Sequence, residues 1–250
     1  FNFADNALIG GAAPGEGNVI SGNGFYGVII NGSGNFIQGN FIGTNLAGDV
    51  ALGNADGGIN LFGSGNRVGG SAAGARNVIS GNAEFGVLIG SSGQFVQGNL
   101  IGTAADGVAP LGNLSDGVHI TNVAVGNNMI GGAGQGEGNT IAFNGGNGVD
   151  IDTAGTGNAI LSNSIFSNTL LGIDLGVNGV TSNDAGDGDT GSNNLQNFPL
   201  ITAADNSGST TIVSGTLNSA AATTFRLEFF ANTSPDASGF GEGETFLGFA

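Results

Sequence analysis

Short stretches in which apolar residues alternate with other residues recur throughout the first 178 residues. The clearest is a Gly-Val-x-Ile phrase, with a Gly-Ile-x-Leu variant, that recurs every 24 to 31 residues. It starts at Gly27, Gly58, Gly86, Gly117, Gly148 and Gly172. Apolar residues spaced two apart lie on one face of a β-strand, so each phrase predicts a strand with one buried face. Recurrence at a period of about 20 to 50 residues indicates a solenoid.

Each repeat contains three apolar stretches separated by Gly, Asn and Ser, as at residues 27–30, 36–39 and 41–44. The stretches are too short for helices, and their β-branched residues favour strands. Three strands per coil, stacked over about six coils, would bury the apolar pairs in one column that a single coil cannot bury. The pattern therefore predicts an all-β fold, with a parallel β-helix at residues 1–178.

Asparagine recurs in the same register, two residues before an inward-facing isoleucine. These residues are Asn18, Asn40, Asn77, Asn99, Asn139 and Asn163. We expect the amides to stack from coil to coil and to bond one another and the backbone at a corner. The 52 glycines of the 250 residues fit a chain that turns three times per coil.

The repeat pattern stops near residue 178, and two different segments follow. Residues 179–198 form an acidic linker rich in Gly, Asp and Asn. Residues 199–250 contain alternating strands at 210–217 and 224–231 and the start of another at 245–250. A two-sheet sandwich has about seven strands, so we expect only part of an antiparallel sandwich.

Composition narrows the possible partners. The chain has 19 acidic and three basic residues, a net charge of −16 at pH 7 and no cysteine. This charge repels phosphate backbones and anionic membranes, and no apolar run is long enough to cross a bilayer. We expect no nucleic-acid partner, no membrane insertion and no disulfides. The basic residues Arg67 and Arg76 are expected to pair with Glu84 or Asp56.

Three phrases carry a resemblance to a known family. They are Gly-Asn-Val-Ile-Ser-Gly-Asn at 17–23, Gln-Gly-Asn-Phe-Ile-Gly-Thr at 38–44 and Asn-Asn-Leu-Gln-Asn-Phe-Pro at 193–199. They resemble the right-handed parallel β-helix repeat proteins of large secreted or surface-attached bacterial polypeptides. Residues 199–250 look like the start of the immunoglobulin-like domain that often follows such repeats. The resemblance implies a right-handed coil and an extracellular or cell-surface location in bacteria.

The resemblance leaves the function open, because related β-helices include polysaccharide lyases, hydrolases and epimerases as well as adhesins and passive stalks. We expect a structural or adhesive segment without catalytic activity, acting as a rigid spacer or filament former. The alternative is a module that binds or modifies a polysaccharide. The two alternatives differ in whether the chain contains a catalytic site.

One outward-facing column contains the best candidates for catalysis. The middle residues of the Gly-Val-x-Ile phrases are Ile29, Asn60, Leu88, His119, Asp150 and Asp174. Neighbouring side chains in such a column lie roughly 5 Å apart, so two carboxylates can share a proton and separate their pKa values. This is similar in kind to polygalacturonases, which place catalytic aspartates on one β-helix face. The alternative is that Asp150 and Asp174 are solvent-facing residues that serve solubility.

The linker contains the best candidate metal site. Asp184, Asp187, Asp189 and Asn193 supply oxygen ligands at short spacing, and the glycines between them permit a tight loop. Such a loop suits Ca²⁺, although the EF-hand spacing is absent. The alternative is a solvated acidic linker.

The ends of the β-helix predict self-association. Strand edges near Leu8 and Ile9 and around residues 173–175 would carry unpaired N–H and C=O groups. The first residues contain neither an initiating Met nor a leader segment, so we expect this chain to be a piece of a longer one. End-to-end contact with more of the same chain or with another copy is therefore expected.

Overall fold

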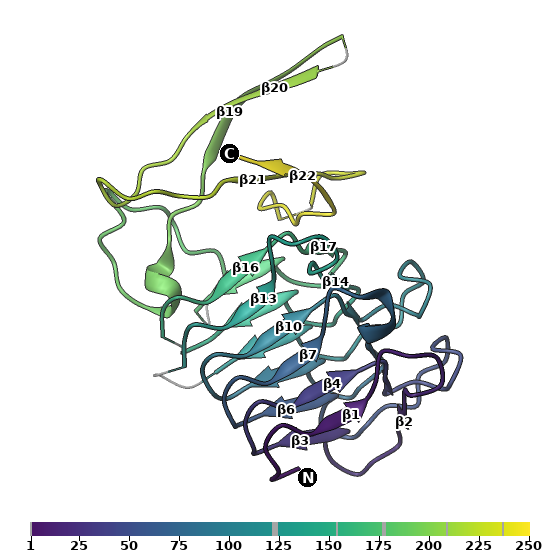
Figure 1. The fold of residues 1–250 in the computed structure, drawn as a ribbon. Helices are drawn as coiled ribbons and strands as arrows, with labels where there is room; N and C mark the ends of the chain where they lie inside the picture. The colour runs from purple at the N-terminus through teal and green to yellow at the C-terminus, as the bar shows by residue number, and fades with distance from the viewer. Residues whose placement is uncertain (1, 122–124, 154, 177–178, 209, 237) are drawn as a thin grey trace.

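A computed structural model describes residues 2–121, 125–153, 155–176, 179–208, 210–236 and 238–250. It confirms the predicted parallel β-helix, which has six coils of three strands (Figure 1). The described residues contain no α-helix and two short 3₁₀ turns, η1 (Ala73–Ala75) and η2 (Ser192–Leu195). Stacked coils thus account for most of the ordered structure.

Three parallel sheets run along the helix, and each receives one strand from every coil. The first sheet contains β1 (Leu8–Gly10), β4 (Phe36–Gln38), β7 (Arg67–Gly69), β10 (Phe95–Gln97), β13 (Met129–Gly131) and β16 (Ala159–Leu161). The second contains β2 (Val19–Ile20), β5 (Phe41–Ile42), β8 (Val78–Ile79), β11 (Leu100–Ile101), β14 (Thr140–Ala142) and β17 (Ser164–Phe166). The third contains β3 (Val28–Ile30), β6 (Ile59–Leu61), β9 (Val87–Ile89), β12 (Val118–Ile120), β15 (Val149–Ile151) and β18 (Ile173–Leu175).

The Gly-Val-x-Ile phrases form the third sheet in the predicted register. Val118 pairs with Val87 on one side and with Val149 on the other, and Ile120 lies between Ile89 and Ile151. These side chains are fully buried inside the coil. Burying an aliphatic side chain contributes about 1.5 to 3 kcal/mol, and this gain requires the coils above and below.

Side-chain amides form a ladder at each of the three corners. The predicted Asn40 ladder consists of Asn18, Asn40, Asn77, Asn99, Asn139 and Asn163. A second, the Asn54 ladder, consists of Asn23, Asn54, Asn82, Asn113, Asn144 and Asn168. A third, the Asn66 ladder, consists of Asn2, Asn35, Asn66, Gln94, Asn128 and Asn158. The prediction of a stacked amide column is confirmed, and two more columns accompany it.

Asn99 illustrates how one amide joins two coils. Its Oδ1 accepts hydrogen bonds from the backbone N and the Nδ2 of Asn77 in the coil before. Its own N and Nδ2 donate to Oδ1 of Asn139 in the coil after, at 3.0 Å each, and Nδ2 also donates to the carbonyl of Val68 at 2.9 Å. Asn99 is 1% exposed, so these bonds satisfy buried polar groups without water.

Glycine is required where a ladder amide approaches the backbone. Gly69 has φ +81°, and a Cβ at this position would collide with the carbonyl of Gln97 and the amide of Asn99. Gly10 and Gly131 occupy the same position in other coils, with φ +84° and +82°. Only glycine combines a positive φ with so close a contact.

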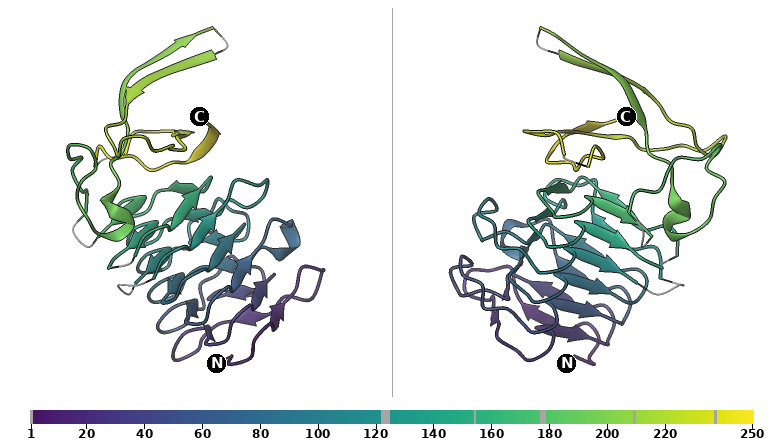
Figure 2. Two further views of the ribbon diagram at one scale, coloured as in Figure 1. Left: turned by 60° about the vertical axis from the view of Figure 1, so that its left-hand side comes forward. Right: turned by 180° about the vertical axis from the view of Figure 1, so that it is seen from behind.

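Two antiparallel pairs follow the helix. β19 (Leu200–Ser207) pairs with β20 (Thr210–Thr216), and β21 (Glu228–Ala231) pairs with β22 (Thr245–Phe249). The β19–β20 hairpin extends away from the helix (Figure 2) and its described residues are exposed. The predicted antiparallel region is confirmed as two separate pairs, and the immunoglobulin-like assignment is not tested by them.

The segment around β21 and β22 covers part of the last coil. Gly243 bridges Ile165 of β17, with N to O at 2.8 Å. Oε1 of Glu242 accepts the backbone N and the Nδ2 of Asn168, so a carboxylate ends the Asn54 ladder. Burial is the main cause that raises the pKa of Glu242 above its usual range. Asn193 ends the Asn66 ladder by accepting from the N of Asn158.

The outer strand edges of β18 and β1 remain unpaired in the described residues. β18 has no strand beyond it in the described residues, and Ile173 is 44% exposed. At the opposite end Leu8 of β1 is 58% exposed. The expected open edges are therefore present at the first coil and at β18, whereas β17 is covered.

Replacement of Asn99 by alanine tests the ladder. Asn77 and Val68 would lose their partners inside the helix, so we expect the free energy of unfolding to fall by about 3 kcal/mol or more. Urea unfolding followed by circular dichroism measures the change. Asn206→Ala, in the exposed strand β19, is the matched control and should change stability by less than about 0.5 kcal/mol. Equal losses in the two variants would contradict a structural role for the ladder.

Candidate functional site

The third sheet contains the predicted His–Asp column. His119 is the middle residue of β12, and it lies directly beside Asp150 of β15, which lies beside Asp174 of β18. The flanking valines and isoleucines point inward, so these three side chains share the outer face of the sheet. The predicted register of the three residues is therefore observed.

The two aspartates of the column are buried, although they lie on the outer face of the sheet. Asp150 and Asp174 are each 6% exposed. The ring of Phe85, from the coil before, stacks on the imidazole of His119 with centroids 4.5 Å apart and an interplanar angle of 27°. The interpretation of Asp150 and Asp174 as solvent-facing solubility residues is therefore wrong, because little of either residue is exposed to solvent.

His119 lies between two carboxylates. Its Nδ1 is 2.9 Å from Oδ2 of Asp150 and 3.1 Å from Oδ2 of Asp116. The backbone N of Asn147 donates to Oδ1 of Asp116 at 2.6 Å and fixes that carboxylate. We refer to Asp116, His119, Asp150 and Asp174 as the His119 cluster.

The sequence reasoning missed Asp116. It is the residue just before the glycine of its Gly-Val-x-Ile phrase, where the other coils have Tyr26, Gly57, Phe85, Asn147 and Leu171. Only the fourth coil has a carboxylate at this position. Reading that second column beside the first would have placed Asp116 next to His119.

Burial and charge shift the pKa values in the cluster. Burial disfavours the imidazolium, but hydrogen bonds and negative charge from Asp116 and Asp150 outweigh it and raise the pKa of His119 to about 9. Burial, and then the charge of Asp150, raise the pKa of Asp174 to about 6. Burial also raises the pKa of Asp150, against the opposing effect of His119. With this pKa, His119 is an imidazolium at neutral pH.

The arrangement suits proton transfer. Asp174 changes protonation near neutral pH and lies next to Asp150, which keeps one oxygen on the imidazolium. A carboxyl group whose pKa is raised toward neutral pH can act as a general acid. Oδ1 of Asp150 and Oδ1 of Asp174 are buried and have no hydrogen-bond partner among the described residues.

The linker brings three of its four predicted ligands together. Carboxylate oxygens of Asp184, Asp187 and Asp189 lie within 4.8 Å of one another. Asp187 accepts hydrogen bonds from the N of Asn197 at 2.8 Å and from Oγ of Ser219 at 2.6 Å. Oδ1 of Asp189 is buried without a hydrogen-bond partner in the described part of the chain. These three residues offer carboxylate oxygens, the ligand type that Ca²⁺ prefers.

Asn193 lies outside this group of carboxylates. Its Oδ1 accepts from the N of Asn158 at 2.9 Å, and its Nδ2 donates to the carbonyl of Asn158 at 2.7 Å. Both polar atoms of the side chain are therefore engaged at the end of the Asn66 ladder. The candidate calcium site therefore consists of the side chains of Asp184, Asp187 and Asp189, without Asn193.

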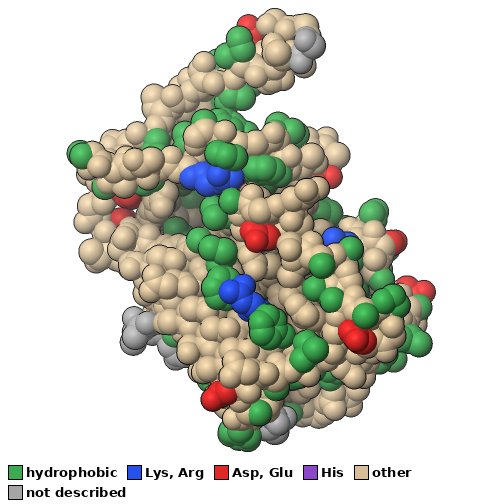
Figure 3. All heavy atoms as spheres, viewed as in Figure 1, with side chains coloured by type: hydrophobic (Ala, Val, Ile, Leu, Met, Phe, Trp, Pro, Cys, Tyr) green, Lys and Arg blue, Asp and Glu red, His purple; other side chains and the backbone are tan. Residues whose placement is uncertain are grey.

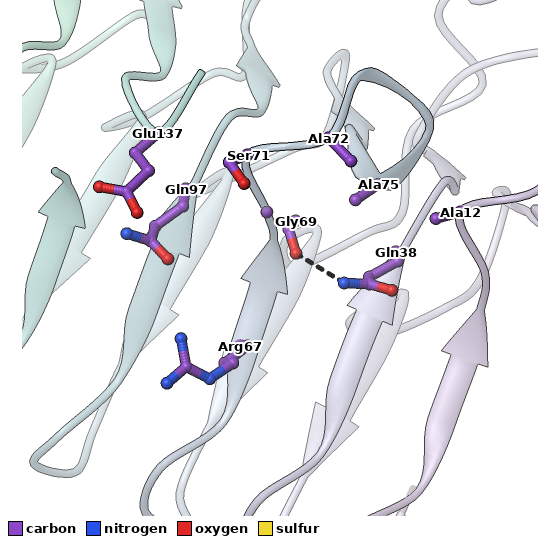
Figure 4. Close-up of a pocket in the computed structure, with 10 residues that line it drawn as sticks. Ala12, Gln38, Arg67, Gly69, Ser71, Ala72, Ala75, Gln97 and Glu137 are labelled. Carbon is purple, nitrogen blue, oxygen red and sulfur yellow. Dashed lines mark hydrogen bonds between the residues drawn. The ribbon is translucent and has the colours of Figure 1, made fainter. Parts of the chain in front are cut away.

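A hollow of about 290 Å³ lies on the outer face of the first sheet, at β4, β7 and β10 (Figure 4). Gln38, Arg67 and Gln97 project from these strands, and Glu137 and residues 70–75 border them. The guanidinium carbon of Arg67 is 4.0 Å from the centroid of the Phe95 ring. The hollow thus combines a cation, held by its stacking on Phe95, with the amide groups of Gln38 and Gln97.

The expected pairing of Arg67 and Arg76 with Glu84 or Asp56 is wrong. Arg67 stacks on an aromatic ring, and Nε of Arg76 donates to the carbonyl of Gly98 at 3.1 Å. Among the described residues the arginine that pairs with a carboxylate is Arg226, whose Nε is 2.8 Å from Glu228. The coil geometry directs the first two side chains toward the neighbouring strands instead.

On the face shown in Figure 3, acidic side chains are scattered among hydrophobic and uncharged polar ones. No helix in the described residues has the length and apolar character needed to cross a membrane.

The chain matches no family model, no curated protein and no solved structure. The candidate sites therefore depend on their own geometry.

Titration of the only histidine in the chain tests the electrostatics of the cluster. NMR of the His119 ring should give a pKa of about 9 in the folded protein, and Asp150→Asn should lower it. Because this pKa lies above the unfolded value of about 6.5, the stabilisation is complete below pH 6.5 and is lost as pH rises through 9. Asp205→Asn, on β19, is the control. A folded pKa near 6.5 would contradict the described contacts.

Proposed function

We propose that this chain is a structural or adhesive segment of a secreted or surface-attached bacterial protein, in which the β-helix is a rigid spacer. The observation that carries the proposal is the presence of amide ladders at all three corners across six coils. Bending the helix would lengthen buried hydrogen bonds at a corner, and each buried group left without its partner costs about 1 to 3 kcal/mol.

The hydrophobic interior supports the same role. Ile30, Ile89, Ile120 and Ile151 lie in one column inside the coil and are fully buried. Separating adjacent coils would bring this apolar surface into water. Local stability is thus shared between neighbouring coils. A rigid β-helix of this kind would hold the segments attached to its two ends at a fixed distance.

A glycan-active module is the second candidate, because the His119 cluster offers an acid and a base. The raised pKa of Asp174, about 6, and the hydrogen bond of Asp150 to His119 support it. In this function Asp174 would donate a proton and Asp150 would act as the partner carboxylate. His119 would hold Asp150 in place. A glycan-binding module without catalysis would use the hollow lined by Gln38, Arg67 and Gln97.

Incubation with a panel of acidic and neutral polysaccharides distinguishes the two candidates. For a spacer we expect no cleavage, elimination or epimerisation by wild type, measured by reducing-end assay, absorbance and NMR. The spacer proposal fails if wild type and Asp205→Asn modify a polymer and Asp150→Asn does not. Asp205→Asn changes an exposed strand and controls for lost charge. Retention of the chain on a polymer without chemistry would support the glycan-binding alternative.

We also propose end-to-end self-association through the first coil. Leu8 and Val19 are 58% and 45% exposed there, and the outer edges of β1 and β2 have no strand beyond them in the described residues, whereas Asn2 bridges β3. Unpaired parallel edges recruit other strands. Light scattering over a concentration range tests this proposal, and a monomer at every concentration would contradict it.

Calcium is proposed to bind at Asp184, Asp187 and Asp189. A ligand that binds only the folded state adds about 2.7 kcal/mol at a hundred times its Kd, so millimolar Ca²⁺ should raise the Tm by at least about 3 °C over EDTA. Asp189→Asn should remove this shift, and Asp205→Asn should keep it. Identical melting curves in Ca²⁺ and EDTA would leave the residues as a solvated acidic linker.

A further inference from the structure

The His119 cluster contains buried carboxylate oxygens that the protein itself does not satisfy. Asp150 is 6% exposed, and its Oδ1 has no hydrogen-bond partner among the described residues. The same is true of Asp174. Buried charged oxygens without a partner are costly, and in native proteins they often indicate a missing water or ion. One imidazolium cannot satisfy all of these oxygens.

The spacing within the cluster matches that of ligands around a small cation. Nδ1 of His119 is 2.9 Å from Oδ2 of Asp150 and 3.1 Å from Oδ2 of Asp116. All three residues offer ligand atoms within 4.8 Å of one another. Tetrahedral ligands at about 2.0 to 2.2 Å from a zinc ion lie about 3.3 to 3.6 Å from one another. A cation could therefore bind if the three side chains moved apart by a few tenths of an ångström.

The surrounding structure holds these side chains in place. The backbone N of Asn147 donates to Oδ1 of Asp116, so Oδ2 is the oxygen directed at His119. Phe85 stacks on the imidazole and fixes the plane of the ring. His119 and Asp150 are held by the β12–β15 register. Outer contacts of this kind position ligands in metal sites.

We propose that Asp116, His119 and Asp150 form a binding site for a divalent first-row transition metal ion, represented by Zn²⁺. Nδ1 of His119, Oδ2 of Asp116 and the carboxylate of Asp150, whose Oδ1 has no other partner among the described residues, are the ligands, and Asp174 lies beside the site as a further carboxylate. Imidazole nitrogen suits zinc and its neighbours, whereas Ca²⁺ and Mg²⁺ prefer all-oxygen sites. Zn²⁺ replaces the Nδ1 proton, which leaves to solvent.

This site is distinct from the calcium candidate in the linker and does not depend on the spacer function. It joins β12 of one coil to β15 of the next through side chains, because Asp116 and His119 belong to one coil and Asp150 to the other. Binding at such a position would stabilise the stack of coils locally. The alternative is an internal ion pair in which the imidazolium alone bridges the two carboxylates.

Calorimetric titration of the tag-free chain with Zn²⁺ tests the proposal. The chain is first treated with EDTA and dialysed, and millimolar Ca²⁺ is present so that the linker carboxylates are occupied. We expect one saturable site with proton release, and binding at least tenfold weaker in His119→Ala and Asp150→Asn. Asp205→Asn should bind as wild type does. Undiminished binding in His119→Ala, or the absence of saturable binding in wild type, would overturn the proposal.

A second measurement uses the wild-type chain and so does not depend on the folding of a variant. The NMR signals of the His119 ring should move to a separate set as Zn²⁺ reaches one equivalent. Co²⁺ in place of Zn²⁺ should give visible absorption bands of a site with nitrogen and oxygen ligands. Ring signals that do not change with either ion would show that the cluster is an internal ion pair only.

Discussion

The hydrogen bond from one ladder amide to the next is the interaction on which the rest of the structure depends. Each corner of the coil bends the backbone and leaves N–H groups that no strand pairing can satisfy. In the Asn40 and Asn54 ladders one Oδ1 accepts both the backbone N and the Nδ2 of the preceding coil, as Asn77 and Asn144 illustrate. This arrangement fixes the register between coils. The register in turn aligns the isoleucine columns and the His119 cluster.

The third corner shows what happens when the residue type changes. Gln94 replaces asparagine in the Asn66 ladder, and its longer side chain turns back to the carbonyl of Gly63 and to Ser91. Its Oε1 still accepts the N of Asn66, but Nδ2 of Asn66 is left buried without a partner among the described residues. The coil tolerates one such loss because the strands on both sides remain paired.

Periodicity in the sequence predicted the coil, the strands of the third sheet and the Asn40 ladder, because each depends only on residues at a fixed offset. The Asn54 ladder carried the same kind of signal, since each member stands four residues before a Gly-Val-x-Ile glycine, as Asn113 does before Gly117. Burial of Asp150 could not be read in this way. It depends on loops and on side chains of neighbouring coils, whose paths no offset specifies. The position of Asn193 depends likewise on how the linker folds back onto the last coil.

The ladders also have a direction. In the Asn40 and Asn54 ladders the side-chain amide N–H groups donate to the side-chain oxygen of the next coil toward the C-terminal end, as in the bond from Asn18 to Asn40. The last coil therefore presents N–H groups, and the carboxylate of Glu242 meets one pair of them. The first coil presents oxygens. The two ends of the stack therefore differ in their hydrogen-bonding groups. Two copies could extend one another's ladders only if both stacks ran in the same direction. The Glu242 segment would then have to move away from the junction.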